Sequence, residues 1–249
     1  MLAPKAIIFD LGYTLVEWST NDETLKRAWA ICYDALVTGL SERQWPDRST
    51  FIQAMREAEE AHWQRVVKEQ WSGPPLGLIR DGMRRLGRSA DEQECQMALD
   101  GYARAIEGWI VPFPDAYPTL SLLRSRGYRL GLLSNTWWAA EWHHGALAAH
   151  GLVPLLDTMV YTSDLPHSKP HPSVFLEVAM RLGVQAKDCV MVGDRMIDDI
   201  GGALGVDMAA IWLKNDRSWP RPEHIVPTAC IKELAELPVL LDTWRSQEP

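Results

Sequence analysis

The sequence predicts an α/β fold: a doubly wound parallel sheet with an inserted α-helical domain. Three observations predict it. A continuous apolar run occupies residues 6–9, helical periods dominate residues 21–109, and short apolar runs alternate with helical segments from residue 114 onward. Strict alternation of strand and helix implies right-handed crossovers and therefore a parallel sheet.

Length and composition limit the functional classes. A chain of 249 residues suits one α/β domain with a sizeable insertion. With 47% hydrophobic and 23% charged residues, the composition is that of a globular protein. The formal net charge of -8 provides no basic stripe for a phosphate backbone, so we expect no nucleic-acid partner.

Cysteine usage and hydropathy bear on the compartment. The four cysteines lie far apart with no CxxC pair, which argues against a zinc knuckle or a disulfide framework and fits reduced thiols. The apolar run 6–9 is too short for a signal peptide, and no run of about 18 apolar residues follows. We expect a cytoplasmic monomer or homodimer with no membrane partner.

The first predicted elements follow from local patterns. Residues 6–9 are apolar at every position, which is typical of a strand covered on both faces, and this strand stops at Asp10. Residues 21–109 predict four helices, separated by breaks at Gly39, 45–46, 72–75 and Gly87. A proline-rich stretch closes this block, and a further helix starts near residue 114 and ends near residue 127.

Strands and helices then alternate. The predicted strands are 128–133, 158–161, 189–192 and 208–213, and the predicted helices are 139–150, 172–182, 197–204 and a closing helix at 231–244. We divide the chain into a core of residues 1–15 and 114–249 and a helical insertion of residues 16–113. An insertion after the first strand lies above the strand ends, where such sheets bind ligands, so we expect it to act as a lid.

Two polar segments follow predicted strands. Asp10 leaves the first strand in IIFDLGYTLVE, with Thr14 four residues later. A strand-ending aspartate more often caps a turn than reacts, so this segment is weak support alone. GLLSNT places Ser134 and Asn135 after the next core strand, where hydroxyl and N–H groups can hold an anion, although an ordinary turn fits as well.

Two further segments carry charge. Lys169 lies between turn signals in HSKPHPSVF, and most lysines in such turns have no function. In VMVGDRMIDDIGGA, Asp194, Asp198 and Asp199 follow an apolar strand. Acidic groups gathered at one strand end repel each other unless a cation balances them, which favours a metal site over helix capping alone.

The order of the four segments indicates one site. Asp10, Ser134, Lys169 and Asp194 each follow a different predicted core strand, and the ends of parallel strands form one crevice. A carboxylate nucleophile, anion donors, a cation and metal-binding acids suit phosphoryl transfer. Mg²⁺ prefers such oxygen ligands, so we expect Asp10 and Asp194 to hold it.

These four motifs together resemble those of the haloacid dehalogenase superfamily, and the resemblance covers the whole chain. It implies a Rossmann-like core with residues 16–113 as a helical cap of the first insertion type. It also implies that Asp10 forms an aspartyl-phosphate, that Lys169 stabilises the charges, and that Ser134 with Asn135 binds the phosphoryl group. The implied Mg²⁺ ligands are Asp10, the main-chain carbonyl of Gly12, Asp194 and Asp199, and Thr14 and Trp18 are candidates for substrate contact.

The nucleophile loop departs from the pattern of the resembled family. Its phosphatases usually read DxDGT, whereas DLGYT places Gly12 where the second aspartate belongs. That aspartate is the usual general acid and base, a role worth about 10²–10⁴-fold. We therefore expect turnover of esters whose leaving groups need little protonation, such as acyl, aryl or anomeric phosphates. Gly12→Asp should raise alkyl-phosphate hydrolysis if space allows.

Three alternatives remain open. Dehalogenases of the family also lack this aspartate, but they need no metal and do not carry a Gly193–Asp194 motif of this kind. Phosphonate hydrolases use a cap lysine, and Lys26 and Lys68 are in no recognisable context. A binding protein that has lost catalysis through Gly12 is the third. The leading hypothesis is an Mg²⁺-dependent phosphatase acting on a small phosphorylated metabolite.

Overall fold

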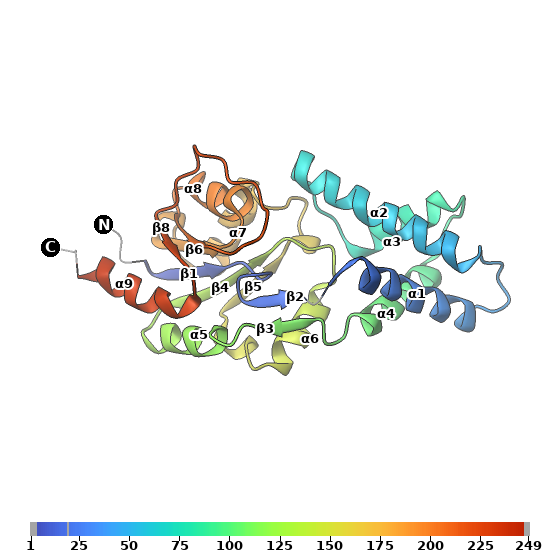
Figure 1. Cartoon of the computed structure of the whole chain (residues 1–249), viewed down its shortest axis with the longest axis horizontal. Helices are drawn as coiled ribbons and strands as arrows, with labels where there is room; N and C mark the ends of the chain where they lie inside the picture. The colour runs from blue at the N-terminus through green and yellow to red at the C-terminus, as the bar shows by residue number, and fades with distance from the viewer. Residues whose placement is uncertain (1–3, 19, 247–249) are drawn as a thin grey trace.

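A computed structural model describes residues 4–18 and 20–246, in which a six-stranded parallel sheet lies between two layers of helices (Figure 1). The strand order is β5-β4-β1-β6-β7-β8. The strands are β1 (Ala6–Phe9), β4 (Arg129–Ser134), β5 (Thr158–Tyr161), β6 (Cys189–Gly193), β7 (Ala209–Leu213) and β8 (Ala229–Ile231). The predicted doubly wound parallel sheet is confirmed.

Strand β1 occupies the centre of the sheet. Ile7 pairs in register with Leu130 on one side and Val190 on the other. All four β1 residues are fully buried, and their side chains alternate between the apolar clusters on the two faces. This double burial explains the uninterrupted apolar run and carries the chain to Asp10 at the carboxyl edge of the sheet.

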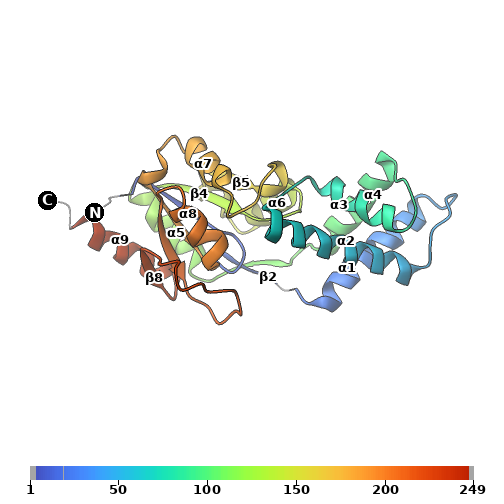
Figure 2. The same cartoon turned by 90° about the horizontal axis from the view of Figure 1, so that it is seen from above.

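Helices cover both faces of the sheet (Figures 1 and 2). One face packs against α5 (Ala116–Ser125), α6 (Ala140–Ala149) and α9 (Leu237–Arg245), through side chains such as Leu120, Leu147 and Leu241. The other packs against α7 (Pro172–Arg181) and α8 (Gly202–Leu204), through Phe175 and Ala203. This burial leaves the strand ends as the open edge.

The insertion lies at the opposite end of the long axis from both termini (Figure 1). Its described helices are α1 (Asp22–Gly39), α2 (Arg48–Glu69), α3 (Pro75–Arg85) and α4 (Glu92–Ala105), as predicted. Reciprocal capping boxes begin α1 at Asn21 and α4 at Asp91. Trp29 and Tyr102 belong to the same apolar cluster as Phe9, so the helices share a core with the sheet.

Two predicted segments differ in the structure. Residues 231–244 do not form one helix: β8 ends at Ile231 and α9 begins at Leu237. The apolar residues of β8 pair with β7, and the apolar residues of α9 follow after only five positions. In the sequence, the two apolar segments therefore look like one helical pattern. The predicted helix 197–204 is a π-helical turn, Met196–Gly201, followed by the short α8.

An antiparallel ribbon that the sequence did not predict joins the insertion to the sheet. It pairs β2 (Val16–Trp18) with β3 (Ile110–Pro112). A second connection lies beyond α2, where Ser72 N–H donates to Pro166 O at 3.1 Å and Ser168 N–H donates to Gln70 O at 2.9 Å. These bonds fix the end of α2 against the loop that carries Lys169. None of the described helices has the length and apolarity needed to cross a membrane.

Candidate active site

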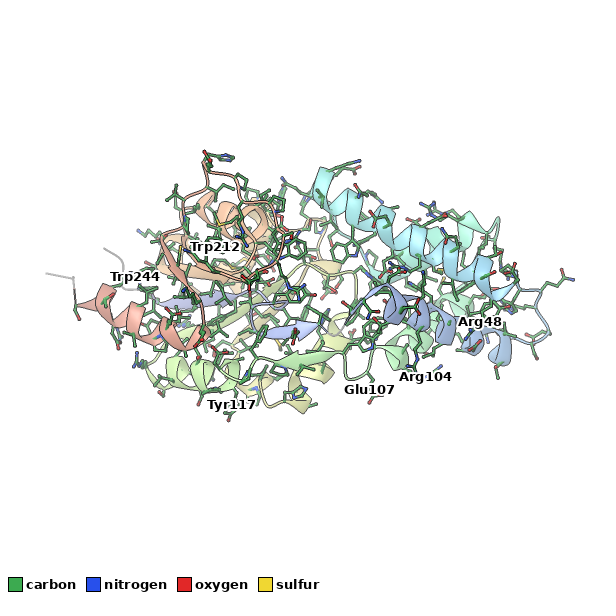
Figure 3. The ribbon with its side chains drawn as sticks, viewed as in Figure 1. Arg48, Arg104, Glu107, Tyr117, Trp212 and Trp244 are labelled. Carbon is green, nitrogen blue, oxygen red and sulfur yellow. The ribbon has the colours of Figure 1, made fainter. Side chains whose placement is uncertain are left out.

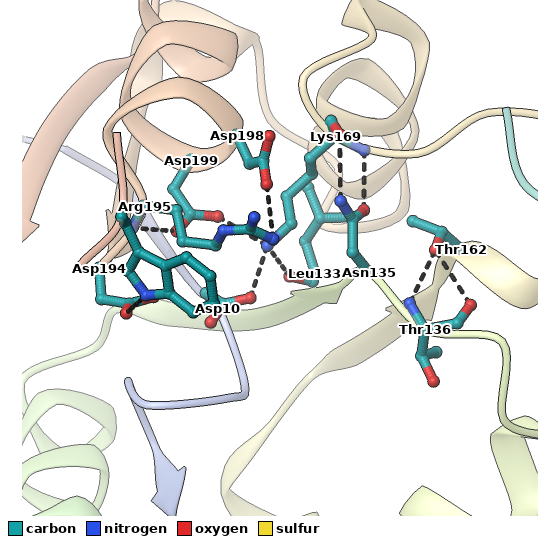
Figure 4. A network of polar contacts seen from close by, with 11 residues as sticks. Asp10, Leu133, Asn135, Thr136, Thr162, Lys169, Asp194, Arg195, Asp198 and Asp199 are labelled. Atoms are coloured by element: carbon teal, nitrogen blue, oxygen red, sulfur yellow. Dashed lines mark hydrogen bonds and ion pairs between the residues drawn. The ribbon is translucent and has the colours of Figure 1, made fainter. Parts of the chain in front are cut away.

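Asp10 lies where β1 leaves the sheet. Its N–H donates to Val192 O at 2.9 Å, which continues the β1–β6 ladder by one bond and fixes the carboxylate at the strand end. The residue is 7% exposed. Its Oδ1 accepts from Lys169 Nζ at 2.5 Å (Figure 4).

Lys169 is buried, and each N–H of its ammonium group donates a hydrogen bond. Its ammonium donates to Asp10 Oδ1, to Asp199 Oδ1 at 2.7 Å and to Leu133 O at 3.0 Å, which uses all three donors. Asn135 fixes the main chain here: its amide donates to Lys169 O at 3.0 Å and its carbonyl accepts from Lys169 N at 2.8 Å. Lys169 lies in the loop before α7 and not directly at the end of β5, because the turn Thr162–Asp164 intervenes.

Asp199 connects Lys169 to the β6 turn. It is fully buried, and its Oδ2 accepts from the N–H of Arg195 at 2.9 Å. A Cβ placed on Gly193 would lie 2.4 Å from Asp199 Cγ, so the glycine of the GD motif makes room for this carboxylate. The next acid, Asp198, pairs instead with Arg195 at 2.7 Å.

Asp194 is held by residues that the sequence did not indicate. Its Oδ2 accepts from Asn215 Nδ2 at 2.8 Å and from Trp219 Nε1 at 3.0 Å, and its main-chain carbonyl accepts from Trp212 Nε1 at 3.0 Å. These partners lie 18 to 25 positions further along the chain. The position of Asn215, a polar residue shortly after the predicted strand 208–213, is a signal that could have pointed to it, because the end of β7 belongs to the same sheet edge.

The acids gather closely enough to share a cation. Carboxylate oxygens of Asp10, Asp194 and Asp199 all lie within 4.8 Å of one another. Asp194 Oδ1 is buried and has no hydrogen-bond partner among the described residues. Leaving a buried carboxylate oxygen unpaired is costly, and Mg²⁺ takes such oxygens as ligands. The donor set therefore fits Mg²⁺. Whether Asp199 ligates it, and whether the Gly12 carbonyl does, stay predictions.

The electrostatics favour a cation as well. Burial, followed by the charge of Asp199, raises the pKa of Asp194 to about 6. The pKa of Asp10 is raised to about 7, first by burial, with Lys169 opposing the shift. One ammonium does not balance three neighbouring carboxylates, so a divalent cation would stabilise their charged forms.

A cavity of about 490 Å³ opens above Asp10 and Lys169. Ser134 and Asn135 line it, as does the Gly12 loop. Thr14 is buried nearby, but it is not among the lining residues, so its role in substrate contact stays a prediction. The wall is rich in aromatic side chains, most of which the sequence did not single out: Tyr13, Trp18, Trp63, Tyr102, Trp137, Trp138 and Trp219.

One sequence-based condition is not met. The prediction that Gly12→Asp raises alkyl-phosphate hydrolysis requires space beside residue 12. A Cβ on Gly12 would lie 2.3 Å from Trp18 Nε1 and 3.0 Å from Trp18 Cδ1, closer than side chains approach each other. The indole occupies the space that a larger residue 12 requires.

Comparison with known proteins identifies the family. The family described as haloacid dehalogenase-like hydrolase matches residues 4–207. The chain is 30% identical over 240 residues to a glyceraldehyde 3-phosphate phosphatase of Methanopyrus kandleri, covering 94% of this chain and 95% of that protein. It is 27% identical over 255 residues to the N-acylneuraminate-9-phosphatase of Homo sapiens, covering 96% and 94%.

Solved structures show the same fold. A HAD phosphatase from Thermococcus onnurineus superposes with a TM-score of 0.62 at 26% identity, covering 95% of this chain and 97% of that one. A 2-haloacid dehalogenase from Pseudomonas syringae superposes with a TM-score of 0.69 at 24% identity, covering 98% and 100%, which bears on the fold alone. From the family match and these named phosphatases, we conclude that the chain belongs to the haloacid dehalogenase-like hydrolases and is a phosphatase-like hydrolase.

Proposed function

We propose that this hydrolase is an Mg²⁺-dependent phosphatase that acts on a small phosphorylated metabolite through an aspartyl-phosphate at Asp10. One observation carries the proposal: the Asp10 carboxylate lies beneath a cavity, bonded to Lys169 at 2.5 Å, with two further carboxylates within 4.8 Å. This juxtaposition supports the proposal, because phosphoryl transfer uses a nucleophile, a stabilising cation and acids that hold a metal.

The first step places Asp10 for attack. Lys169 holds Oδ1, which leaves Oδ2 to form the bond to phosphorus as the ester P–O bond breaks. The Ser134 hydroxyl, at the cavity edge, is the side-chain donor that we assign to a phosphoryl oxygen. Bound Mg²⁺ would neutralise phosphoryl oxygens and orient them toward the nucleophile.

The second step returns the enzyme to its starting state. Water attacks the phosphorus of the aspartyl-phosphate, the Asp10 Oδ2–phosphorus bond breaks, and phosphate leaves with the carboxylate restored. Lys169 stays bonded to Asp10 and Asp199 and stabilises the returning charge. Asn135 supports the step indirectly, because both of its amide atoms hold the Lys169 main chain.

Gly12 restricts the leaving group in this proposal. A residue without a side chain cannot protonate the departing oxygen, so esters of acidic alcohols should react faster than alkyl esters. The test compares phosphate release from 4-nitrophenyl phosphate with that from glyceraldehyde 3-phosphate, the alkyl ester named in one relative. Equal efficiency on both would rule out the restriction.

We also propose that residues 16–113 form a cap over a core of residues 1–15 and 114–249. One stripe of α2 supports this role, because several of its residues line the cavity: Arg56, Glu59, Glu60, Trp63, Val66 and Val67.

The four cysteines, all within the described residues, form no disulfide, which suits the proposed cytoplasmic location. Light scattering would distinguish monomer from homodimer.

The decisive assay measures phosphate release from 4-nitrophenyl phosphate with Mg²⁺ and with a chelator. We expect release with Mg²⁺ alone, and a loss of at least about 10³-fold in Asp10→Asn, as for other nucleophile removals. Asp188→Asn is the matched control, because that carboxylate forms a surface pair with Lys5 at 2.9 Å. Ligand binding without turnover would instead indicate a binding protein, and halide release from a 2-haloacid in chelator would indicate a dehalogenase.

A further inference from the structure

Trp18 fills the volume beside Gly12. A Cβ on Gly12 would meet Nε1, Cδ1 and Cε2 of the indole at 2.3, 3.0 and 3.4 Å. The nitrogen edge of the ring is thus the part nearest to residue 12. Both residues line the cavity that contains Asp10. The indole N–H therefore stands where the side chain of a larger residue 12 would project.

Packing against other aromatic rings also holds this indole in place. Trp138 contacts it edge-on with ring centroids 5.0 Å apart, and the buried His143 does so at 5.9 Å. The Trp18 backbone pairs with Ile110 in the β2–β3 ribbon. The ring cannot leave the Gly12 side without disrupting these contacts, so its position is a built feature of the site.

The indole N–H is available to a ligand. Across residues 4–18 and 20–246, Trp18 Nε1 has no hydrogen-bond acceptor, and neither has Nε1 of Trp63, Trp137 or Trp138, which line the same cavity. What distinguishes Trp18 is that its Nε1 lies beside Gly12. Partly buried tryptophan N–H groups normally find a partner, which here is a group entering the cavity. An indole donates a hydrogen bond but does not release its proton, so it cannot act as a general acid.

The wall around Trp18 suits a flat leaving group. Trp137 and Trp138 follow the Ser134 turn and line the cavity, and Tyr102 lies 4.9 Å from Trp137 between ring centroids. Trp63 of α2 lines the cavity as well. Tyr102 and Trp137 are fully buried and packed against each other, so Trp18 and Trp63, which are partly exposed, are the rings that we expect an aryl group to contact, beside the charged Arg56 and Glu59 of α2.

We propose that Trp18 is a catalytic residue whose indole N–H donates to the leaving-group oxygen, and that the substrates are aryl phosphomonoesters. This rests on the proposed phosphatase function. As Asp10 bonds to phosphorus, the P–O bond of the ester breaks and its electron pair stays on the leaving oxygen. The alcohol departs as a phenolate stabilised by the N–H, and it takes its proton from water after release.

The first test introduces a carboxyl group at residue 12, with the Trp18 indole present and with it removed. Gly12→Asp alone should lower 4-nitrophenyl phosphate turnover at least about 10-fold, because the new side chain displaces Trp18 and the nucleophile loop. Gly12→Asp combined with Trp18→Ala should hydrolyse glyceraldehyde 3-phosphate at least 10-fold faster than the wild type. The proposal is overturned if Gly12→Asp alone gains this alkyl activity, because Trp18 would then not exclude the acid.

The second test keeps an aromatic side chain of smaller size and removes the N–H. Trp18→Phe should lower kcat more for phenyl phosphate than for 4-nitrophenyl phosphate, because the more basic phenolate depends more on a hydrogen bond. A loss that is equal for both esters would show that the indole only packs, and would overturn the proposal. This test stands even if the double variant does not fold.

Controls separate the possible failures. Trp244→Phe, at the far end of the molecule on α9 (Figure 3), should keep wild-type rates on both esters, and Gly77→Asp, where a Cβ meets nothing within 4 Å, controls for an added carboxyl group. If no ester releases phosphate with Mg²⁺, the proposed function fails. If esters react but alkyl and aryl rates are equal, the phosphatase stands and the role of Trp18 fails.

Discussion

The Lys169 ammonium donates to the buried carboxylates of Asp10 and Asp199. Among the described residues, no other cationic side chain pairs with them, so removing Lys169 leaves their negative charge unbalanced. Breaking a buried ion pair by removing one partner costs about 3–5 kcal/mol. We expect Lys169→Met to lower the free energy of unfolding by about 3 kcal/mol without Mg²⁺. Urea denaturation measures this change.

A matched lysine provides the control for that measurement. Lys5 also pairs with an aspartate, Asp188, but its side chain is 67% exposed. Exposed pairs contribute about 0–1 kcal/mol, so Lys5→Met should change the unfolding free energy little. Equal destabilisation by the two variants would contradict the buried charge balance described for the site.

His143 makes stability depend on pH. It is fully buried, its Nε2 lies 2.9 Å from Thr136 Oγ1, and burial lowers its pKa to about 3. The unfolded chain therefore binds a proton, near pH 6.5, that the folded chain does not. Stability is complete above that pH and falls as the pH decreases toward 3.

This histidine should contribute a loss of about 2 kcal/mol between pH 7 and pH 5. Because other groups also titrate in this range, the measurement is the difference in urea unfolding free energy between the wild type and His143→Gln. The variant should lose about 2 kcal/mol less than the wild type over the same interval. Parallel pH profiles of the two proteins would show that His143 protonates equally in both states.

Local patterns predicted that Asp10, Lys169 and the acids after Gly193 lie together, because each follows an apolar strand or a turn signal, and the structure places them within contact of one another. They could not identify Trp219 or Asn215 as the partners of Asp194, since 25 and 21 positions separate them from it and folding alone brings them together. Nor does the sequence show that Trp18 touches Gly12. That contact depends on the register of the β2–β3 ribbon.

At the scale of elements, the helix α2 ends in a strained residue. Gln70 caps it in the left-handed region, with φ 52° and ψ 29°. A side chain in this conformation costs about 1–2 kcal/mol, which glycine avoids. We expect Gln70→Gly to gain about 1 kcal/mol and to raise Tm by about 2–4 °C in a chain of this size.

The main chain of Gln70 keeps its role in this variant, since its carbonyl accepts from Ser168 N–H at 2.9 Å whatever the side chain is. Gln70→Ala is the control, because alanine carries the same Cβ and should leave Tm unchanged. A lower Tm in Gln70→Gly would mean that the glutamine side chain stabilises this turn more than its conformation costs.

The periodic pattern of apolar residues predicted the long helices and strands well. The four helices of the insertion were predicted because apolar residues recur over several helical turns. The central strands were predicted because they form uninterrupted apolar runs. The three-residue strands β2, β3 and β8 are too short to show a period, and their pairing depends on residues far away in the chain. Short elements therefore escaped prediction, including the ribbon that positions Trp18.

At the scale of the molecule, one apolar cluster extends from the sheet into the insertion. It contains Phe9 and Val192 of the sheet together with Trp29 and Phe51 of α1 and α2. The cavity lies between these two parts, and each part contributes both charged and aromatic side chains to its wall, such as Asp10 and Trp138 from the core and Arg56 and Trp63 from the insertion. The shared core fixes the insertion relative to the strand ends, so Asp10, Lys169 and the α2 residues line the same space.

Because the acids lie at the centre of this arrangement, a cation bound there should stabilise the whole fold. Ligand at 100 times its Kd adds about 2.7 kcal/mol, which corresponds to a rise in Tm of about 5–10 °C for a chain of this size. We expect Mg²⁺ to produce such a rise in a thermal melt. Asp194→Asn should abolish it, because Asp194 Oδ1 is the buried oxygen without a partner among the described residues.

Asp207→Asn is the control for the thermal melt, since Asp207 is exposed and its φ of 61° is one that asparagine adopts readily. This variant should keep the full Mg²⁺-dependent rise. The measurement does not depend on activity, so it tests the cation site even if the substrate is wrong. If Asp194→Asn gains as much Tm from Mg²⁺ as the wild type, the cation binds elsewhere, and the acids at the strand ends need another explanation.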